Sequence, residues 1–277
     1  MAQTATVQDT RRCHALVTGA STGLGAVFAT ALARQQYDLI IVARSRERLE
    51  ALAGHLRQSY GIAVEVVVAD LTHSTALRTV EEHVAGDNAL ELLVNNAGFG
   101  TTGPFVRLDP KQEEAEILLN VLALVRLTRA ALPGMIARGR GAIINVSSLA
   151  AFAPGPYDAT YSATKAFVNS FTEALHEELC GTGVHVQTLC PGFTYTEFQQ
   201  RAGIDISKIP TFAWMTPEAV VDASLRALQR RQVVCVPGLG NRLLALLMGA
   251  APRRLVRRVS GLLAHRVLGG DEHSGSE

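Results

Sequence analysis

The chain has 277 residues, of which 48% are hydrophobic and 18% are charged, and its formal net charge is +1 at pH 7. This length fits one large α/β domain or two smaller ones, and the composition is that of a globular protein. The even charge balance gives no extended positive field, so nucleic acid is excluded as the expected partner.

The N-terminal residues carry Asp9 and lack the hydrophobic core of a signal peptide before the first apolar run. No uninterrupted apolar run reaches the roughly 18 residues that a membrane-spanning helix needs. The cysteines and histidines are scattered, without a CxxC pair or a spacing suited to zinc. We therefore expect a cytoplasmic protein with reduced thiols and no metal.

Apolar runs alternate with helical patterns along most of the chain, which is typical of βαβ units. Strands are expected at 13–18, 38–43, 63–68, 91–94, 141–146, 184–189 and 232–236. Helices are expected at 23–36, 46–59, 73–85, 111–134, 157–180 and 216–230. This order predicts an α/β fold with one doubly wound sheet of about seven mainly parallel strands and helices on both faces.

The chain divides into three predicted parts, since no Pro/Gly/Ser linker splits its regular region. Residues 1–12 form an extension, residues 13–238 form a single catalytic domain, and residues 239–277 form a basic amphipathic segment with a polar tail. A long connection at about 193–217 interrupts the regular pattern. Long connections of this kind usually carry function, so we expect a lid there.

A glycine-rich stretch, TGASTGLG, follows the first expected strand and leads into a helix. Glycines at 19, 23 and 25 permit a tight turn and let backbone N–H groups approach a pyrophosphate at the helix N-terminus. The alternative is a glycine-rich turn without a ligand. The position between a strand and a helix favours nucleotide binding.

The second strand ends at Arg44-Ser45-Arg46, where an NAD site usually carries an acid for the ribose 2′-hydroxyl. Arg44 and Arg46 offer charge-assisted donors to a 2′-phosphate instead. The alternative is a solvated start of a helix, but arginine is unfavourable there unless an anion binds. The residues therefore favour NADP(H).

Between Ser148 and Lys165, the sequence places a hydroxyl, a phenol and an ammonium at spacings that can converge. Tyr161 and Lys165 lie four residues apart, on one face of a predicted helix. A neighbouring ammonium would lower the pKa of the phenol and make it a better acid-base catalyst. The pair alone could equally be a solvated surface contact.

Further motifs follow the ends of successive strands, namely Asp70-Leu71, NNAG at 95–98, Ser147-Ser148 and PGFTYT at 191–196. Together with TGASTGLG, Asn120 and YSATK, these motifs match the pattern of a known family in order and spacing over residues 13–236. On these motifs the chain resembles the short-chain dehydrogenase/reductase family, of the type that prefers NADP. The resemblance implies a Rossmann-type fold.

The resemblance also implies roles for individual residues. Tyr161 would be the general acid or base, and Ser148 would hold the substrate oxygen. Lys165 would bind the nicotinamide ribose and lower the pKa of Tyr161. Asn120 would help to position a water next to Lys165, although it could instead be a polar residue satisfied inside a helix interface.

The expected cofactor-binding set combines the strand-end motifs with the catalytic helix. Its members are Gly19, Ser21, Thr22, Gly23, Leu24, Gly25, Arg44, Ser45, Arg46, Asp70, Leu71, Asn96, Ala97, Gly98, Tyr161, Lys165, Pro191, Gly192, Phe193, Thr194 and Thr196.

The expected substrate pocket is mostly apolar or aromatic and contains no arginine that could clamp a carboxylate. Its candidates are Phe99, Ser148, Leu149, Phe152, Tyr157, Phe193, Phe198 and Trp214. An uncharged hydrophobic ketone, aldehyde or secondary alcohol is the expected substrate. Several of these side chains could instead fill the core.

The segment from 239 to 269 holds six arginines and no acid, interleaved with leucine, valine and alanine. It could lie on an anionic membrane surface, pack on a second subunit, or cover the domain edge as a solvated helix. The family resemblance also suggests a homodimer or homotetramer through the helices at 111–134 and 157–180.

These features predict an NADP(H)-dependent oxidoreductase, such as a carbonyl reductase, that transfers hydride between nicotinamide and a carbonyl or secondary alcohol. The alternative is a catalytically silent NADP-binding protein with a regulatory or interaction role. Asn120, Ser148, Tyr161 and Lys165 are all present, which favours the enzyme.

Overall fold

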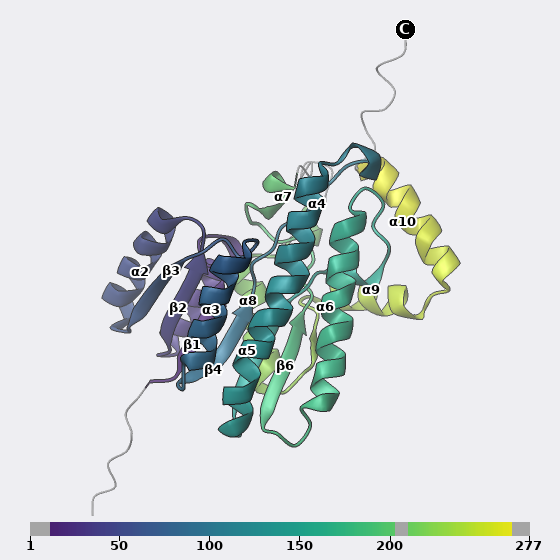
Figure 1. The fold of residues 1–277 in the computed structure, drawn as a ribbon. Helices are drawn as coiled ribbons and strands as arrows, with labels where there is room; N and C mark the ends of the chain where they lie inside the picture. The colour runs from purple at the N-terminus through teal and green to yellow at the C-terminus, as the bar shows by residue number, and fades with distance from the viewer. Residues whose placement is uncertain (1–11, 203–209, 268–277) are drawn as a thin grey trace, which may run out of the picture.

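The structure is a computed structural model that describes residues 12–202 and 210–267 (Figure 1). Most of the predicted N-terminal extension, residues 203–209 of the predicted lid and the polar tail from residue 268 lie outside the described residues.

A seven-stranded sheet forms the centre of the molecule, in the order β3-β2-β1-β4-β5-β6-β7, and each neighbouring pair is parallel. The strands are β1 (His14–Thr18), β2 (Asp38–Ala43), β3 (Val64–Val68), β4 (Leu90–Asn95), β5 (Gly141–Val146), β6 (Val184–Leu189) and β7 (Val234–Cys235). The Rossmann-type fold expected from the sequence is therefore confirmed.

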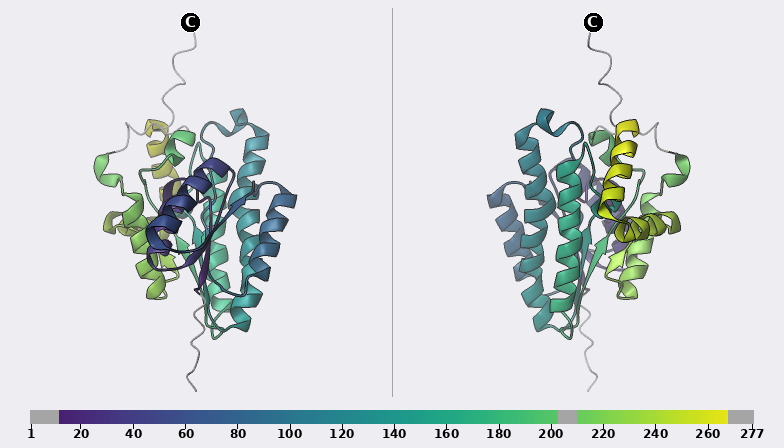
Figure 2. Two further views of the ribbon diagram at one scale, coloured as in Figure 1. Left: turned by 90° about the vertical axis from the view of Figure 1, so that its left-hand side faces the viewer. Right: turned by 90° about the vertical axis from the view of Figure 1, so that its right-hand side faces the viewer.

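Helices cover both faces of the sheet (Figure 2). On one face lie α1 (Gly23–Arg34), α2 (Arg46–Tyr60) and α8 (Pro217–Gln229). On the other lie α3 (Ser74–Gly86), α5 (Leu124–Ala137) and α6 (Ala159–Glu178). Shorter elements are α4 (Pro110–Ile117), α7 (Phe198–Arg201), η1 (Phe105–Arg107), η3 (Leu149–Phe152) and η5 (Thr211–Ala213).

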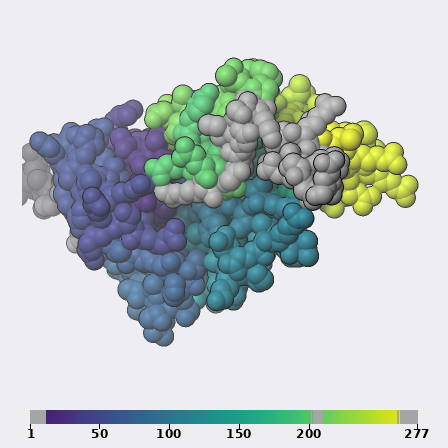
Figure 3. Space-filling model, turned by 90° about the horizontal axis from the view of Figure 1, so that it is seen from above, coloured from purple at the N-terminus to yellow at the C-terminus, as the bar shows by residue number. Residues whose placement is uncertain are grey.

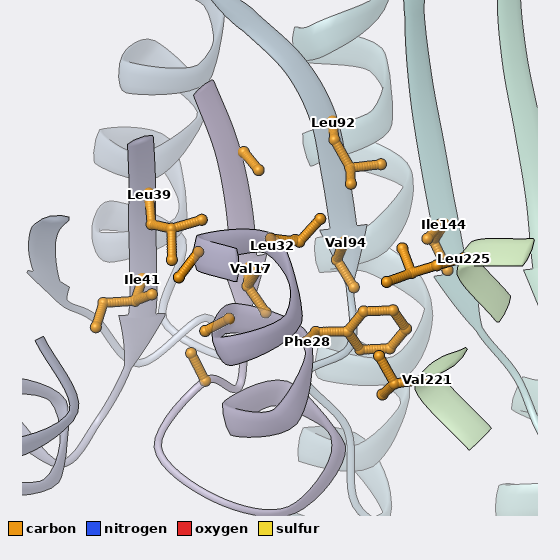
Figure 4. Packing of buried hydrophobic residues seen from close by; sticks show 14 of the residues in the cluster. Val17, Phe28, Leu32, Leu39, Ile41, Leu92, Val94, Ile144, Val221 and Leu225 are labelled. Carbon is orange, nitrogen blue, oxygen red and sulfur yellow. The ribbon is translucent and has the colours of Figure 1, made fainter. Parts of the chain in front are cut away.

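Successive side chains of each strand point to opposite faces of the sheet and so contribute to two separate hydrophobic cores. Ala15 and Val17 of β1 point to the α1 side, whereas Leu16 points to the α3 and α5 side. On the α1 side, Phe28 and Leu32 pack against the sheet and against α8 (Figure 4). Burial on both faces explains why these strands read as continuous apolar runs.

The strand order changes direction between β1 and β4, because β2 and β3 follow on one side of β1 and β4 to β7 on the other. Hydrogen bonds connect the ends of β1 and β4 at this point. The Thr18 hydroxyl accepts from the backbone N–H groups of Asn96 and Ala97, both at 3.0 Å. The Asn96 side chain donates to the Thr18 carbonyl at 2.9 Å. Ligands of open α/β sheets bind at such a switch point.

The helix expected at 111–134 differs from the prediction. It consists of α4, a π-helical segment η2 (Leu118–Ala123) and α5. A π turn closes i→i+5 hydrogen bonds and takes in extra residues, which a search for the 3.6-residue period does not detect. Asn120 lies inside this segment.

The C-terminal segment forms two helices, α9 (Leu239–Ala250) and α10 (Arg253–Val267). Pro252 lies between them. Proline has no backbone N–H, so it interrupts the helical hydrogen bonds at a position where the chain turns and none is lost. In the described part of the chain, no helix combines the length and apolar character needed to cross a bilayer.

Candidate active site

A cavity of about 990 Å³ lies along the carboxyl ends of the central strands. Its walls include the glycine-rich turn after β1, the ends of β2 to β6, helix α6 and the segment at 191–199. The motifs that stand far apart in the sequence therefore meet at one edge of the sheet.

Helix α6 presents Tyr161 and Lys165 to this cavity. The Lys165 Nζ atom lies 5.6 Å from the centre of the Tyr161 ring and donates to the carbonyl of Val146 at 2.9 Å. Lys165 is 5% exposed, so its ammonium is held inside the protein beside the phenol.

Ser148 begins η3 directly after β5, where its hydroxyl accepts from the N–H of Ala150 at 3.1 Å and makes a hydrogen bond with Tyr161. The neighbouring Ser147 also lines the cavity, but its hydroxyl donates to the carbonyl of Lys165 at 3.0 Å. Ser148 is thus the serine that meets the phenol, and Ser147 anchors helix α6.

Burial shifts the pKa values of both Tyr161 and Lys165. Burial raises the pKa of Tyr161, the hydrogen bond with Ser148 opposes this, and the charges of Asp158 and Glu116 add to the increase. Burial also lowers the pKa of Lys165 to about 8, opposed by Glu116. Lys165 is not among the causes that act on Tyr161, and desolvation leaves the pKa of Tyr161 above its ordinary value; the lowering effect of Lys165 stays a prediction.

Asn120 lies in the π-helical segment, is 1% exposed and does not itself line the cavity. Its amide donates to the Phe99 carbonyl at 2.8 Å and the Thr164 hydroxyl at 3.2 Å, and its carbonyl accepts from the Phe99 N–H at 3.1 Å. These contacts clamp the segment after β4 to helix α6. The role in holding a water stays a prediction.

A buried acidic network lies next to the catalytic helix, and the sequence analysis missed it. The Thr101 hydroxyl lies 2.5 Å from Glu113 Oε1 and 2.8 Å from Glu116 Oε2. One hydroxyl donates one proton, so the second contact requires a proton on a carboxyl group. Thr160, the neighbour of Tyr161, donates to the other oxygen of Glu113.

Glu116 is the member of this network suited to carry that proton, because it is fully buried and its Oε1 atom has no partner in the described structure. Burial raises the pKa of Glu116 to about 7, and the nearby Glu113 adds to the increase, against hydrogen bonds from Thr101 and the charge of Lys165. The sequence signal was only two acids at helical spacing, which usually indicates a solvated face.

At the other end of the cavity, the glycine-rich turn leads into α1, whose first turn contains no acid. Gly25 does not line the cavity. A Cβ atom on it would lie 2.3 Å from the Gly19 carbonyl, so this glycine permits close packing of the turn. The unpaired N–H groups and the dipole of α1 suit an anionic pyrophosphate.

Two arginines line the cavity near the end of β2: Arg44, which follows the strand, and Arg48, in the first turn of α2, which was not predicted from the sequence. Arg48 donates to the carboxylate of Glu197 at 3.0 and 3.2 Å. Arg46 does not line the cavity; it lies 4.0 Å from Glu50, and its side chain is 72% exposed. Of the two predicted arginines, Arg44 alone faces the site.

Arg44 Nη1 lies 4.0 Å from Asp70 Oδ2. Burial favours a higher pKa for Asp70, but two hydrogen bonds from Thr72, together with Arg44 and His73, hold the pKa of Asp70 below its ordinary value. Asp70 is therefore ionised at neutral pH and oriented by Thr72.

Most of the predicted cofactor set lines the cavity. The lining members are Gly19, Ser21, Thr22, Gly23, Leu24, Arg44, Ser45, Asp70, Leu71, Asn96, Ala97, Gly98, Tyr161, Lys165, Pro191, Gly192, Phe193, Thr194 and Thr196.

The predicted substrate pocket is brought together in part. Ser148, Phe99, Leu149, Phe193 and Phe198 line the cavity, with the rings of Phe198 and Tyr161 5.5 Å apart. The other three do not line it: Phe152, which packs with Cys190, Val236 and Ala245, Tyr157, and Trp214, which stacks on Tyr195 at 4.7 Å.

Two further lining residues, Met248 of α9 and Ser260 of α10, were missed by the sequence analysis. They come from the C-terminal helices, about 90 residues beyond Tyr161, and no motif in the sequence connects them to the site. Within the described residues, no group of three or more side chains could hold a metal ion.

The family model described as short chain dehydrogenase matches residues 13–206. The chain is 35% identical over 231 residues to a very-long-chain 3-oxoacyl-CoA reductase of Anas platyrhynchos, covering 80% of this chain and 72% of the relative. It is 32% identical over 219 residues to the ketoacyl reductase HetN of a Nostoc species, covering 78% and 75%.

Solved structures with this fold cover nearly the whole chain. A short-chain dehydrogenase from Sphingobium yanoikuyae in complex with NADPH has a TM-score of 0.80 and 37% identity, covering 96% of this chain and 98% of that one. The bulky-bulky ketone specific alcohol dehydrogenase from Comamonas testosteroni has a TM-score of 0.76 and 30% identity, covering 97% and 98%.

Proposed function

This chain belongs to the short-chain dehydrogenase/reductase family, and we propose that it transfers hydride between NADP(H) and the carbonyl or secondary alcohol of a hydrophobic substrate. Membership makes it an oxidoreductase that uses a nicotinamide cofactor. The observation that carries the proposal is the meeting of Ser148 with Tyr161, beside Lys165, on the wall of the cavity.

The choice of NADP(H) rests on Arg44. Arg44 lines the cavity after the end of β2, where no acid is available for a ribose 2′-hydroxyl, and its guanidinium offers planar donors for a phosphate. The similarity to a short-chain dehydrogenase in complex with NADPH supports this choice. The nearby Asp70 would meet the adenine amino group.

When bound, the nicotinamide supplies or accepts the hydride. In the direction of reduction, Tyr161 Oη gives its proton to the oxygen of the substrate carbonyl, and the Ser148 hydroxyl donates a hydrogen bond to the same oxygen. The burial that raises the pKa of Tyr161 keeps the phenol protonated until negative charge develops on that oxygen. The tyrosine therefore acts as the acid in this direction and as the base in the other.

Lys165 has a second role in this scheme. Its ammonium, fixed by the Val146 carbonyl, would hold the ribose hydroxyls and restore the proton that Tyr161 gives away. A pKa of about 8 allows Lys165 to release and regain a proton near neutrality.

The substrate end of the cavity supports a hydrophobic ligand. Apolar side chains line the cavity together with Tyr161, among them Phe99, Leu149, Phe198 and Met248, and the ring of Phe198 lies 5.5 Å from the ring of Tyr161. The two lining arginines, Arg44 after β2 and Arg48 in the first turn of α2, lie on the cofactor side. The relatives named for 3-oxoacyl and bulky ketone substrates point in the same direction. We therefore assign a ketone with a bulky apolar substituent as the substrate class.

We also propose a cytoplasmic homodimer or homotetramer through α5 and α6. Ile136 and Phe167 are exposed apolar residues on these helices, at 43% and 42%, which supports an interface there. Light scattering of the purified protein would give its mass, and a monomer at all concentrations would reject the assembly.

The function is tested with a panel of ketones of increasing apolar bulk, in which the oxidation of NADPH is followed by absorbance. We expect kcat/KM to increase with apolar bulk. Exclusive turnover of small charged substrates would reject the substrate class. NADPH binding without turnover of any carbonyl compound would favour the alternative of a catalytically silent NADP-binding protein. The presence of all four predicted catalytic residues argues against that alternative.

A further inference from the structure

The two C-terminal helices carry a continuous series of exposed apolar side chains. They lie beyond α6 at the β7 end of the molecule, and α10 projects from that end (Figures 1 and 3). We define the C-terminal surface as the residues with these exposed fractions: Leu239 82%, Leu243 58%, Leu246 69% and Leu247 56% in α9, and Leu255 55%, Val259 46% and Leu262 69% in α10.

The exposure follows from the helical period. In α9, Leu239, Leu243 and Leu246 fall on one side, and Ala245 on the other side is buried. In α10, Leu255, Val259 and Leu262 have the spacing i, i+4, i+7, whereas the buried Val256 lies on a different side. Each helix thus has two apolar sides, one packed on the protein and one uncovered.

Arginines accompany the uncovered side of α10. Arg253, Arg254, Arg257 and Arg258 are exposed, and residues 239–267 contain no acid. Among the described residues, none of these four arginines forms an ion pair with a carboxylate, whereas Arg48, Arg126 and Arg140 elsewhere in the chain do. The surface therefore combines uncovered apolar area with unpaired positive charge.

We propose that the C-terminal surface docks on an anionic lipid bilayer. Leucine and valine side chains would enter the boundary between headgroups and acyl chains, and the arginines would meet lipid phosphates. A second copy of the chain fits this surface less well, because a two-fold interface would bring two sets of unpaired arginines together. The charge therefore selects a lipid surface as the occupant.

The inner sides of the same helices connect this surface to the cavity. Met248 of α9 and Ser260 of α10 line it, so the helices separate the site from the docking surface by one layer. Resting on the proposed function, this arrangement lets an apolar ketone dissolved in the bilayer reach the site beside the membrane.

The test is co-sedimentation of the full-length protein with vesicles of phosphatidylcholine, with and without phosphatidylglycerol, at low and high salt. We expect binding only when phosphatidylglycerol is present, and less of it at high salt. Arg254→Glu with Arg258→Glu, and separately Leu246→Glu with Leu262→Glu, should each lower vesicle affinity by roughly tenfold or more.

Matched controls lie away from this surface. Arg34→Glu with Arg230→Glu removes the same charge from exposed positions on α1 and after α8, and Val106→Glu places an acid at a residue that is 89% exposed. These controls should bind vesicles like the wild type. Equal losses in the controls, or no binding by the wild type, would overturn the proposal.

Two further readouts separate the competing explanations. A second copy of the chain covers the surface, and the proposal fails, if two results occur together. The wild type does not bind vesicles, and Leu246→Glu with Leu262→Glu lowers the particle mass measured by light scattering. Turnover of a water-soluble ketone should be unchanged in all these variants, whereas turnover of a long-chain ketone held in vesicles should fall in the C-terminal ones. Loss of soluble turnover in the wild type would instead count against the proposed function.

Discussion

The ammonium of Lys165 donates to the carbonyl of Val146 at 2.9 Å, which joins helix α6 to the carboxyl end of strand β5. Because Tyr161 lies one turn before Lys165, the same contact fixes the phenol over the sheet edge, next to Ser148 at the start of η3. The positions of Tyr161 and Lys165 are thus set by a contact between helix α6 and strand β5.

Tyr161→Phe should abolish most turnover while NADPH binding is retained, because in the proposed mechanism the phenol exchanges a proton with the substrate. We expect kcat to fall by about 10²- to 10⁴-fold. Stopped-flow or steady-state assays give kcat, and NADPH fluorescence titration gives the affinity. Tyr60→Phe, far from the cavity, is the control. An unchanged kcat would contradict the assigned role.

Arg44→Asp should weaken NADPH far more than NADH, since the acid would repel a 2′-phosphate and accept a 2′-hydroxyl. The loss of charge-assisted hydrogen bonds is expected to cost about 2 to 3 kcal/mol, or roughly 30- to 150-fold in Kd. Arg46→Asp is the matched control, because Arg46 does not line the cavity. Equal effects of the two variants on both cofactors would argue against a 2′-phosphate site at Arg44.

Gly100→Ala should reduce kcat without unfolding the protein. A Cβ atom at residue 100 would lie 2.9 Å from Cδ2 of Tyr161, so the ring must move away from its position. Displacing a catalytic group by about 1 Å can cost up to about 100-fold in rate. Gly86→Ala, where no atom lies within 4 Å, is the control. Wild-type kcat in Gly100→Ala would show that the phenol tolerates the shift.

Glu116→Gln should change how stability depends on pH. The pKa of Glu116 rises from 4.5 to about 7 on folding, so the native state binds the extra proton, and stability falls as pH rises between these values. Glutamine imitates the protonated acid and lacks this loss.

Relative to the wild type, Glu116→Gln should therefore become more stable by up to about 3 kcal/mol between about pH 4.5 and pH 7. Urea unfolding across this range measures the difference. Glu114→Gln, exposed on the same helix, should follow the wild type. A constant difference between Glu116→Gln and the wild type would contradict the assignment of the proton to Glu116.

The strand ends were predictable because each carries a motif with its own physical requirement. Gly19 and Gly25 mark a turn that needs close backbone approach, and Asn96 follows a strand whose apolar run is plain in the sequence. Since parallel strands end at one edge of a sheet, residues after successive strands meet there whatever lies between them. This rule explains why the motifs after the strands line one cavity.

Arg44 and Arg46 show where such reasoning stops. Both were expected at the 2′-phosphate, but Arg44 precedes the N-cap Ser45 whereas Arg46 is the first residue of α2, and of the two only Arg44 lines the cavity. The same holds for Phe152 and Trp214, which are apolar and near the site in sequence yet pack elsewhere.

The sequence by itself determined the sheet and the nucleotide turn, because those features depend on local pattern and on strand ends, whereas Ser148, Tyr161 and Lys165 were singled out by the order and spacing of the motifs along the whole chain. The tertiary structure decided that burial raises the pKa of Tyr161, that Glu116 contacts Thr101 next to helix α6, and that α9 and α10 contribute Met248 and Ser260 to the cavity wall. Desolvation and contacts between distant segments arise only when the chain packs, so no local pattern records them.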